Sequence, residues 1–340
     1  MACRLVPDLV LDQSLPATSM TPRHDGTILL CGDNGDHLSF TLPSEGTNAA
    51  ATYQLTEPVL ARLLGADTRR TLTGTYPVSR CYAQIGGMGA GYAKAFHGLL
   101  RMPLGCDDIG NEVLQQLQTF EIASSPYYID GCSSDTSLLI LSTQAEKLAV
   151  GVRQAMMRWQ TTAEDHHLVD TASALVFCGV PNALMVEILS WHPDIPVMCA
   201  PAMRNVCDTT VPLAELAPQI DYLTLNALEW EYLTASSGSL AQIPLVSVTN
   251  GPYGSKLIVH GDEEITLPAQ SCAGPVNTNR AGETYGSTAF KALLHYAPGF
   301  FTSTRLDVAL AERIGSIATA QAARQLAITG FAFPPDDWMV

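Results

Sequence analysis

Beyond about residue 170 the sequence alternates regularly between short apolar runs and helix-length segments. The apolar runs have the length of strands buried on both faces, and they are separated by segments such as NALMVEILSWH and ALEWEYLTA. Strands that alternate with helices form a parallel sheet, because each right-handed crossover returns the chain to the same edge. The sequence therefore predicts an α/β fold with a mostly parallel central sheet flanked by helices. The four runs are SALVFCGV (173–180), IPVMCAP (195–201), IDYLTLN (220–226) and IPLVSVTNG (243–251).

The earlier part of the chain has a less regular pattern. The run TILLCG (27–32) is the first clear strand, and what precedes it reads as an N-terminal extension. PYYIDG (126–131) and TSLLILST (136–143) are two short strand-like runs, which we expect to form a hairpin away from the main sheet. We expect the segment 305–327 to be helical throughout.

The composition narrows the classes of partner. The chain has 340 residues, a formal net charge of −15 at pH 7 and only four lysines. Such a surface would repel nucleic acid and anionic membranes, so we expect neither and instead a small-molecule ligand. We find neither a signal peptide nor an uncharged run of about 18 residues that could span a membrane. Nine cysteines stand singly, without a C-x-x-C pair, as is typical of reduced thiols in a cytoplasmic protein.

Two glycine-rich runs have well-known interpretations that their spacing excludes. GGMGAG (86–91) follows a strand-like run and opens a helix, but a G-x-G-x-x-G fingerprint begun at Gly87 would need glycine where Tyr92 stands. GPYGSK (251–256) lacks the four residues between glycines that a P-loop requires. Either run can be a tight turn between packed elements. His166 and His167 fit a solvated polar loop better than a metal site.

The run NTNRAGET (277–284) predicts a turn that enters a helix whose first turn holds small residues and an acid. Helix starts of this kind present backbone N–H groups to an anion. The acid is Glu283, and Arg280 stands beside it. The structural alternative is that Glu283 only stabilises the helix dipole, worth well under about 2 kcal/mol, while Arg280 points to solvent.

A series of motifs resembles those of the ribokinase-like (PfkB) family of sugar and nucleoside kinases. Each motif is weak alone, but their shared order makes the resemblance strong, and it extends from about residue 27 to 335. The motifs are GDNGDH (32–37), GGMGAGYAKA for G-G-x-G-x-N-x-A, GCDDIG for G-x-D-x-x-G, NALE for N-x-x-E, VTNGPYG for V-T-x-G-x-x-G, and NTNRAGE where the family has D-T-x-G-A-G-D.

The resemblance implies a domain organisation and an activity. It implies an extension over residues 1–26 and a ribokinase-like α/β domain over 27–340, with a small β-lid from residues about 36–43, 71–85 and 123–150. The implied activity is the transfer of the γ-phosphate of ATP, with Mg²⁺, to a primary hydroxyl of a sugar or nucleoside.

The resemblance also implies roles for individual residues. Asn34 and Asp36 would hold substrate hydroxyls, and Gly86, Gly87 and Gly91 would let the substrate approach the backbone. The other implied roles are Ala281 and Gly282 as an anion hole, Glu283 as general base, Asn226, Thr249, Gly251 and Gly254 in nucleotide binding, and Glu229 as a Mg²⁺ ligand through water. Arg280 has no counterpart in the family pattern, and from the chemistry of its guanidinium we predict that it clamps a phosphate.

Four positions depart from the family pattern. Glu283 replaces aspartate and so lengthens the base by one methylene, and Arg280 replaces a glycine whose backbone freedom is usually wanted. Ala200 in CAPAMR (199–204) replaces the aspartate of D-P-x-x-R, and Gly91 replaces asparagine. These departures keep a second hypothesis open, that of a catalytically silent ribokinase-like protein with a binding or regulatory role.

Three segments resemble adenosine-kinase-type enzymes more than bacterial ribokinases. They are the insertion TEPVLARLLGAD, the NTN opening of the last motif and the tail GFAFPPDDW. We therefore expect a nucleoside rather than a hexose as acceptor. Separately, we expect the protein to be a monomer or a homodimer.

Overall fold

The computed structural model describes most of the chain beyond residue 80 and separate strands before it. The described ranges are 8–12, 27–32, 37–42, 51–56, 74–77, 81–141, 147–191, 194–235, 240–272, 277–302, 305–328 and 331–339. The chain forms two compact units. The first comprises residues 1–87, 103–117 and 128–155, and the second comprises 88–102, 118–127 and 156–340.

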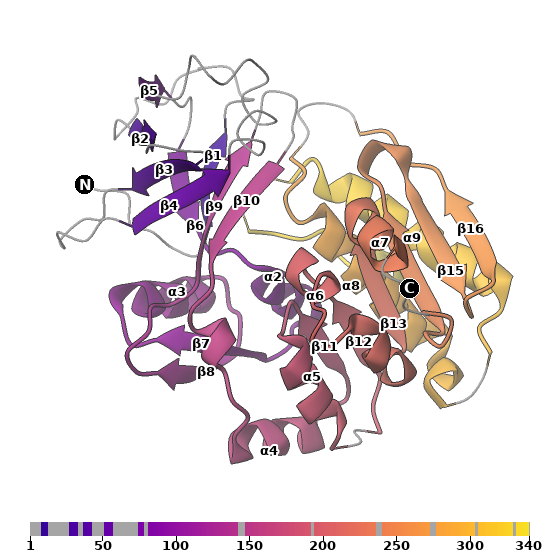
Figure 1. Cartoon of the computed structure of the whole chain (residues 1–340). Coiled ribbons are helices and arrows are strands. Elements are labelled where there is room, and N and C mark those ends of the chain that lie inside the picture. The colour runs from indigo at the N-terminus through magenta and orange to yellow at the C-terminus, as the bar shows by residue number, and fades with distance from the viewer. Residues whose placement is uncertain are drawn as a thin grey trace. The chain divides into compact units, whose positions relative to one another are not determined.

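The second unit is built around a six-stranded sheet with the order β11-β12-β13-β14-β15-β16 (Figure 1). The first four strands pair in parallel, and β15 and β16 continue the sheet antiparallel. The parallel strands are the four apolar runs that the sequence predicts, so the expected mostly parallel sheet is confirmed. The bounds are β11 Leu175–Cys178, β12 Val197–Ala200, β13 Tyr222–Asn226, β14 Leu245–Thr249, β15 Ser255–Val259 and β16 Glu263–Leu267.

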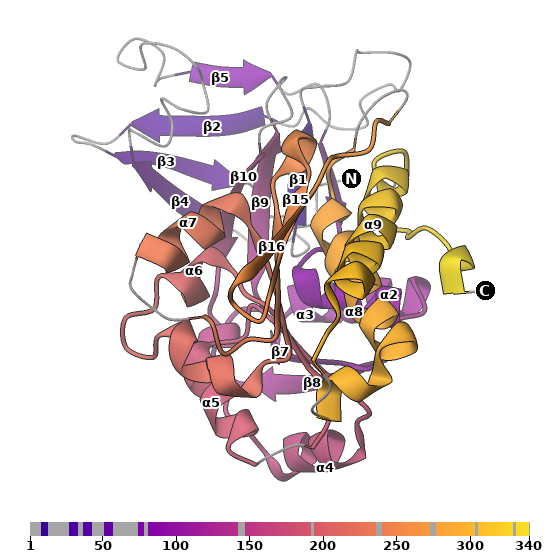
Figure 2. The same ribbon diagram turned by 90° about the vertical axis from the view of Figure 1, so that its right-hand side faces the viewer.

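Both faces of this sheet are buried, because alternate residues of each strand pack into different apolar clusters. Cys199 and Leu223 pack with α5, α6 and α7, whereas Met198 and Tyr222 pack with α2, α8 and α9. Figure 2 shows these two groups of helices on opposite sides of the strands. The resulting helix, sheet and helix layers confirm the predicted α/β fold. The helices are α2 Met88–Phe96, α4 Ala163–Thr171, α5 Asn182–Leu189, α6 Met203–Val206, α7 Ala227–Ala235, α8 Ala281–Tyr296 and α9 Val308–Gln325, with 3-10 turns η2 Met156–Arg158, η3 Leu213–Gln219, η4 Gly251–Tyr253, η5 Pro298–Thr302 and η6 Asp337–Met339.

The first unit contains two four-stranded sheets, with the orders β10-β9-β1-β6 and β4-β3-β2-β5. In the former, β1 pairs in parallel with β9 and the other pairs are antiparallel; the latter is antiparallel throughout. The strand predicted at 27–32 is β2, and β1 lies within the residues that the sequence assigned to an extension. The bounds are β1 Asp8–Asp12, β2 Thr27–Gly32, β3 His37–Leu42, β4 Ala51–Thr56, β5 Gly74–Pro77, β6 Cys81–Gln84, β9 Thr136–Leu141 and β10 Lys147–Val152. The domain boundary at residue 27 and the β-lid segments stay predictions.

The predicted hairpin of PYYIDG and TSLLILST is wrong. The first run forms β8 (Ser124–Ile129), which pairs with β7 (Leu100–Gly105), whereas the second forms β9, which pairs with β1 and β10. The segment between β8 and β9 is held elsewhere: the Asp107 carboxylate, just before α3 (Asp108–Thr119), accepts hydrogen bonds from Ser134 N–H at 2.8 Å and Ser134 Oγ at 2.6 Å. Because β9 has β10 on one side and β1 on the other, it has no free edge for β8.

Helix α4 is fixed within the second unit by a buried ion pair. Thr162 and Asp165 form a reciprocal capping box at its start. Arg101 Nε donates to Asp165 Oδ1 at 2.8 Å, and the two side chains are only 13% and 4% exposed. His166 and His167 lie within α4, so a helix replaces the polar loop expected here. His166 stacks on Trp191 with ring centroids 3.5 Å apart.

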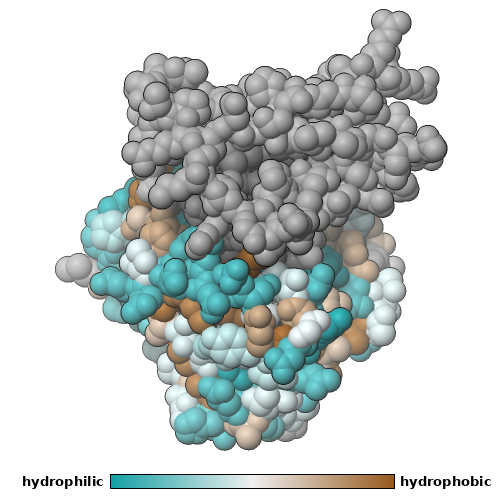
Figure 3. Space-filling view, turned by 90° about the vertical axis from the view of Figure 1, so that its left-hand side faces the viewer, coloured by the Kyte–Doolittle hydropathy of each residue, from teal (hydrophilic) through white to brown (hydrophobic). Residues whose placement is uncertain are grey.

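The described ranges contain neither a membrane-spanning helix nor a cluster of metal ligands. No helix in them is long and apolar enough to cross a bilayer. Within the same ranges, no group of three or more metal-ligating side chains occurs. On the face shown in Figure 3, hydrophilic and hydrophobic residues are intermixed over the described part of the surface.

Candidate functional site

The helix start that NTNRAGET predicts is present as the start of α8. Arg280 is the N-cap residue, in a left-handed conformation, and the helix begins at Ala281. Asn277 anchors the approach through its side-chain amide, which donates to the Ile328 carbonyl at 3.0 Å. The Ala281 N–H makes only a long contact of 3.4 Å with the Thr278 carbonyl. The first N–H groups of a helix lack acceptors within it, so this end can offer them to a ligand.

Arg280 adopts a backbone conformation that residues other than glycine seldom adopt. Its φ is 66°, which costs of order 1 kcal/mol for an L-residue with a side chain. The guanidinium carbon lies 3.8 Å from the centre of the Phe331 ring, and Arg280 is only 7% exposed. Stacking of this kind contributes about 0.5–2 kcal/mol, which offsets the strain. A phosphate-clamp role for Arg280 stays a prediction.

Free space lies next to the first turn of α8. A Cβ placed on Gly282 would have no atom of the described residues within 4 Å. Glu283 follows, half-buried, with its side chain against Gly91 of α2. Backbone N–H groups, open space and a carboxylate therefore occur together within one helical turn. An acid at this position also stabilises the helix through its dipole, whatever its chemical role.

Gly286, one turn after Glu283, allows α8 to approach the sheet closely. A Cβ on Gly286 would lie 2.5 Å from Tyr92 Oη and 3.1 Å from both Met198 Cε and Thr224 Cγ2. Burial raises the pKa of Tyr92 well above its ordinary value, so the phenol stays neutral. The first two turns of α8 are thus held firmly on strands β12 and β13 and on α2.

Asn226 and Glu229 lie where β13 passes into α7, and each caps the other. Asn226 N–H donates to Glu229 Oε2 at 2.9 Å, and Glu229 N–H donates to Asn226 Oδ1 at 2.9 Å. This is capping-box geometry, so the N-x-x-E motif has a structural role of its own. Burial raises the pKa of Glu229 to about 7, against the opposing effect of its hydrogen bonds to Asn226. A nearby cation would favour the ionised carboxylate, and the residue therefore fits Mg²⁺ held through water.

Thr249 lies opposite Asn226 in the register of β14 and β13, and a glycine turn follows it. Gly251 and Gly254 have φ values of 51° and 93°, which other residues rarely adopt. A Cβ on Gly254 would collide with the Leu267 carbonyl oxygen, so packing alone requires this glycine. A Cβ on Gly251 would meet no atom of the described chain within 4 Å, which leaves room for a ligand there.

The carboxyl ends of β11 and β12 lie side by side, with Cys178 opposite Ala200. Ligands of open α/β sheets bind at this edge. Ala200 is only 2% exposed, and its methyl group cannot replace the carboxylate of the family pattern. Arg204 on α6 donates a hydrogen bond to the Gly179 carbonyl, so it holds the turn after β11.

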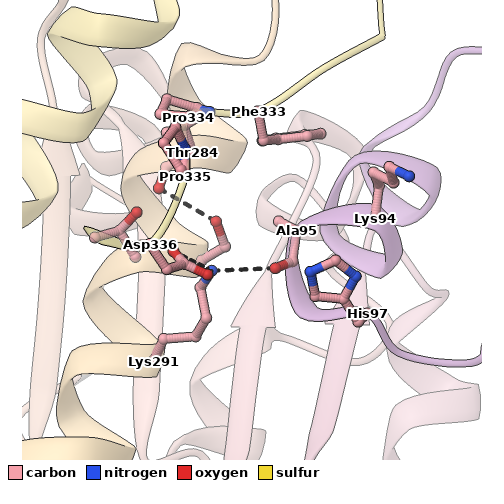
Figure 4. Close-up of a pocket in the computed structure, with 11 residues that line it drawn as sticks. Lys94, Ala95, His97, Thr284, Lys291, Phe333, Pro334, Pro335 and Asp336 are labelled. Atoms are coloured by element: carbon pink, nitrogen blue, oxygen red, sulfur yellow. Dashed lines mark hydrogen bonds and ion pairs between the residues drawn. The ribbon is translucent and has the colours of Figure 1, made fainter. Parts of the chain in front are cut away.

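A pocket of about 240 Å³ lies between α2, α8 and the C-terminal segment (Figure 4). Lys291 Nζ contacts Asp336 Oδ2 at 2.5 Å and donates to the Ala95 carbonyl at 3.1 Å. Lys94 Nζ donates to the Phe120 carbonyl at 2.6 Å. Both lysines are thus engaged within the protein, and the pocket marks where the C-terminal segment docks.

The structure describes some of the predicted substrate residues and not others. Asn34 and Asp36 lie outside the described residues, and their roles stay predictions. Gly86 is buried, and Gly87, directly before α2, has a φ of 84° that suits glycine. Gly91 lies within α2, next to Glu283.

Two aromatic residues near the start of α8 were not predicted as part of the site. Phe331 lies against Arg280, and Phe333 Cζ would be 3.7 Å from a Cβ on Gly91. Their ring centroids are 6.2 Å apart in an edge-to-face arrangement. Two phenylalanines in a tail rich in proline and aspartate are a signal of docking, although they do not indicate which surface receives them.

Residues 83–326 match the pfkB family of carbohydrate kinases. The chain belongs to this family. It is accordingly a sugar or nucleoside kinase, which confirms the activity class expected from the motifs. No individual curated sequence matches this kinase.

The kinase shares its fold with ribokinases and nucleoside kinases of known structure. Ribokinase from Giardia lamblia aligns with a TM-score of 0.62 at 15% identity, over 96% of this chain and 92% of that one. The nucleoside kinase of Burkholderia thailandensis in complex with inosine aligns with a TM-score of 0.61 at 16% identity, over 77% and 87%. The nucleoside kinase of Methanocaldococcus jannaschii aligns with a TM-score of 0.60 at 14% identity, over 99% and 94%. At these identities the likeness shows the fold.

Proposed function

We propose that this kinase transfers the γ-phosphate of ATP to a primary hydroxyl of a nucleoside or sugar, with Glu283 as the general base. The observation that supports this most is the start of α8, where backbone N–H groups, open space at Gly282 and the Glu283 carboxylate lie within one turn. Phosphoryl transfer asks a protein mainly for positioned phosphates, charge neutralisation and a base near the attacking hydroxyl.

Each residue of this turn has a proposed task. The backbone N–H groups of Ala281 and Gly282 form the anion hole for the phosphate oxygens. Glu283 accepts the proton of the attacking hydroxyl, and it is held near the hydroxyl by the contacts of α8 with the sheet. Arg280 is proposed as a phosphate clamp because its guanidinium belongs to the residue directly before these N–H groups.

The metal and nucleotide are assigned to the neighbouring strand ends. When bound, Mg²⁺ would neutralise phosphate charge. Glu229 would hold it through water, and its partner Asn226 keeps one carboxylate oxygen in a fixed position. Thr249, Gly251 and Gly254 would contact the nucleotide, and the room above Gly251 supports this assignment.

The acceptor is proposed to be a nucleoside, held on its sugar hydroxyls by Asn34 and Asp36 and lying on the backbone at Gly86, Gly87 and Gly91. The observation that supports a nucleoside is the adenosine-kinase-like tail, which reaches the start of α8 through Phe331. The β-lid segments would close over this acceptor and exclude water, so that ATP is not hydrolysed. A cytoplasmic monomer or homodimer is part of the same proposal.

The test is ATP consumption over a panel of nucleosides and sugars, with and without Mg²⁺. The proposal predicts Mg²⁺-dependent turnover on at least one nucleoside, a product phosphorylated on its primary hydroxyl, and no turnover on the 5′-deoxy analogue. A hexose phosphorylated far more efficiently than every nucleoside would overturn the acceptor. Binding of a nucleoside with no turnover under any condition would instead favour the catalytically silent alternative.

A further inference from the structure

Gly91 faces the side chain of Glu283 across the contact between α2 and α8. A Cβ on Gly91 would lie 3.3 Å from Glu283 Cγ, 3.6 Å from Glu283 Cβ and 3.7 Å from Phe333 Cζ. Carbon atoms in favourable contact are about 3.5–4.0 Å apart, so the first of these distances is too short for unstrained packing. The methylene groups of Glu283 thus occupy room that exists because residue 91 has no side chain.

The two residues are both departures from the family pattern, and they are in contact. The pattern has asparagine at position 91 and aspartate at 283, whereas this chain has glycine and glutamate. A larger side chain at 283 is therefore matched by a smaller one at 91. The ring of Phe333 also lies near this space, with its Cζ 3.7 Å from the position of a Cβ on Gly91.

We propose that Gly91 is a positioning residue for Glu283, and that positions 91 and 283 function as a coupled pair. The missing Cβ lets the longer carboxylate side chain lie along α2, so that the extra methylene does not displace the carboxylate from the start of α8. The inference rests on the proposed function of Glu283 as the base, but the packing that it describes can be tested without turnover.

The Gly91→Ala variant tests this directly. The added Cβ forces Glu283 Cγ to move by a few tenths of an ångström, and the carboxylate at the end of the side chain moves further. Because a misplacement of about 1 Å can cost about a hundredfold in rate, we expect kcat to fall about tenfold. A rise in the KM for the acceptor would report separately on the proposed contact of the acceptor with Gly91. In a Glu283→Asp background the shorter side chain can turn away from residue 91, and the same Gly91→Ala change should cost less than about twofold.

Gly89→Ala is the matched control, because it is the same change in the same helix. Its added Cβ would lie 3.1 Å from Leu100 Cδ1 and makes no close contact with Glu283. We expect Gly89→Ala to leave kcat within about twofold of the wild type. Thermal unfolding of both variants checks that each is folded. We expect both to fold, because alanine is more favourable than glycine in a helix interior.

Crystal structures of the wild type and Gly91→Ala provide a second readout that does not depend on activity. A shift or a changed rotamer of Glu283 in Gly91→Ala supports the proposal. An unmoved Glu283, or an equal loss of kcat from Gly91→Ala in the wild-type and Glu283→Asp backgrounds, overturns it. A Glu283→Gln variant with full turnover would instead refute the base assignment, and the crystal structures would still decide the packing.

Discussion

Replacing Gly286 with alanine should destabilise the kinase, because α8 packs closely against the sheet and α2 at this residue. The new Cβ would lie 2.5 Å from Tyr92 Oη and 3.1 Å from Met198 Cε and Thr224 Cγ2. Tyr92 and Met198 are 3% and 0% exposed, so neither can move into solvent to relieve the contact. Either α8 or the tyrosine ring must shift by about 1 Å, since unstrained contacts lie at about 3.5 Å or more.

The expected magnitude follows from two opposing effects. Overpacking of a filled core costs about 1–3 kcal/mol, whereas glycine to alanine within a helix gains about 0.5–1 kcal/mol. The net loss lies between about 0 and 2.5 kcal/mol, and a loss of about 1 kcal/mol, near the middle of that range, lowers the unfolding temperature of a chain of 340 residues by about 1–2 °C. Because Glu283 lies one turn earlier on α8, kcat should fall as well.

Thermal unfolding followed by circular dichroism measures the stability change, with Gly282→Ala as the control. Both changes lie in the first two turns of α8, but a Cβ on Gly282 meets no atom within 4 Å among the residues that the structure describes. Gly282→Ala should therefore unfold at or above the wild-type temperature. Equal unfolding temperatures for Gly286→Ala and Gly282→Ala would refute the packing argument.

Two further predictions concern ionisable groups. Burial raises the pKa of Glu229 to about 7, so the carboxyl is increasingly protonated below pH 7 and should bind Mg²⁺ less well. The Mg²⁺ concentration that gives half-maximal activity should then rise about tenfold for each unit by which the pH falls below 7. Glu229→Gln should remove this pH dependence of the Mg²⁺ requirement, whereas Glu231→Gln, at an exposed position, should leave it unchanged. If Glu229→Gln also leaves it unchanged, Glu229 does not bind the metal. Asp165 is buried against Arg101. Burial alone would raise the pKa of Asp165, but hydrogen bonds to Arg101 and Thr162 lower it overall. The ionised carboxylate therefore stabilises the fold above about pH 4, and this stabilisation is lost as the pH falls through the lowered pKa. Asp165→Asn should lower the free energy of unfolding by about 3 kcal/mol at pH 7, measured by urea titration, and a loss no greater than that of the exposed Asp170→Asn would contradict it.

The sequence predicted the sheet of the second unit well, because its strands are short, fully apolar and spaced by helix-length segments. That periodicity is local information. The separation of β8 from β9 was not predictable in the same way, because β9 pairs on one side with β1, a strand from the start of the chain. Local strand pattern alone suggested a hairpin, whereas β9 has β1 on one side and β10 on the other.

In the candidate site, too, the local features were predictable from the sequence and the contacts between distant residues were not. The helix start at Arg280 and Glu283 followed from a short motif, and the need for backbone freedom at 280 agrees with its φ of 66°. The contact of Glu283 with Gly91 and the stacking of Arg280 on Phe331 arise from tertiary packing. Gly91, Arg280 and Glu283 are visible in the sequence as departures from the family pattern, and Phe331 as an aromatic residue in the C-terminal tail. No pattern in the sequence indicates which of these residues are in contact.

The turnover of Glu283→Gln, measured on the best acceptor of the panel, tests the central claim most directly. Glutamine keeps the size of the side chain and removes its ability to accept a proton. We predict that kcat falls by about 10²–10⁴, the usual contribution of a general base, while the dissociation constants for ATP and acceptor change by less than about threefold. Wild-type kcat in Glu283→Gln would contradict the account, because Glu283 would then not be the base.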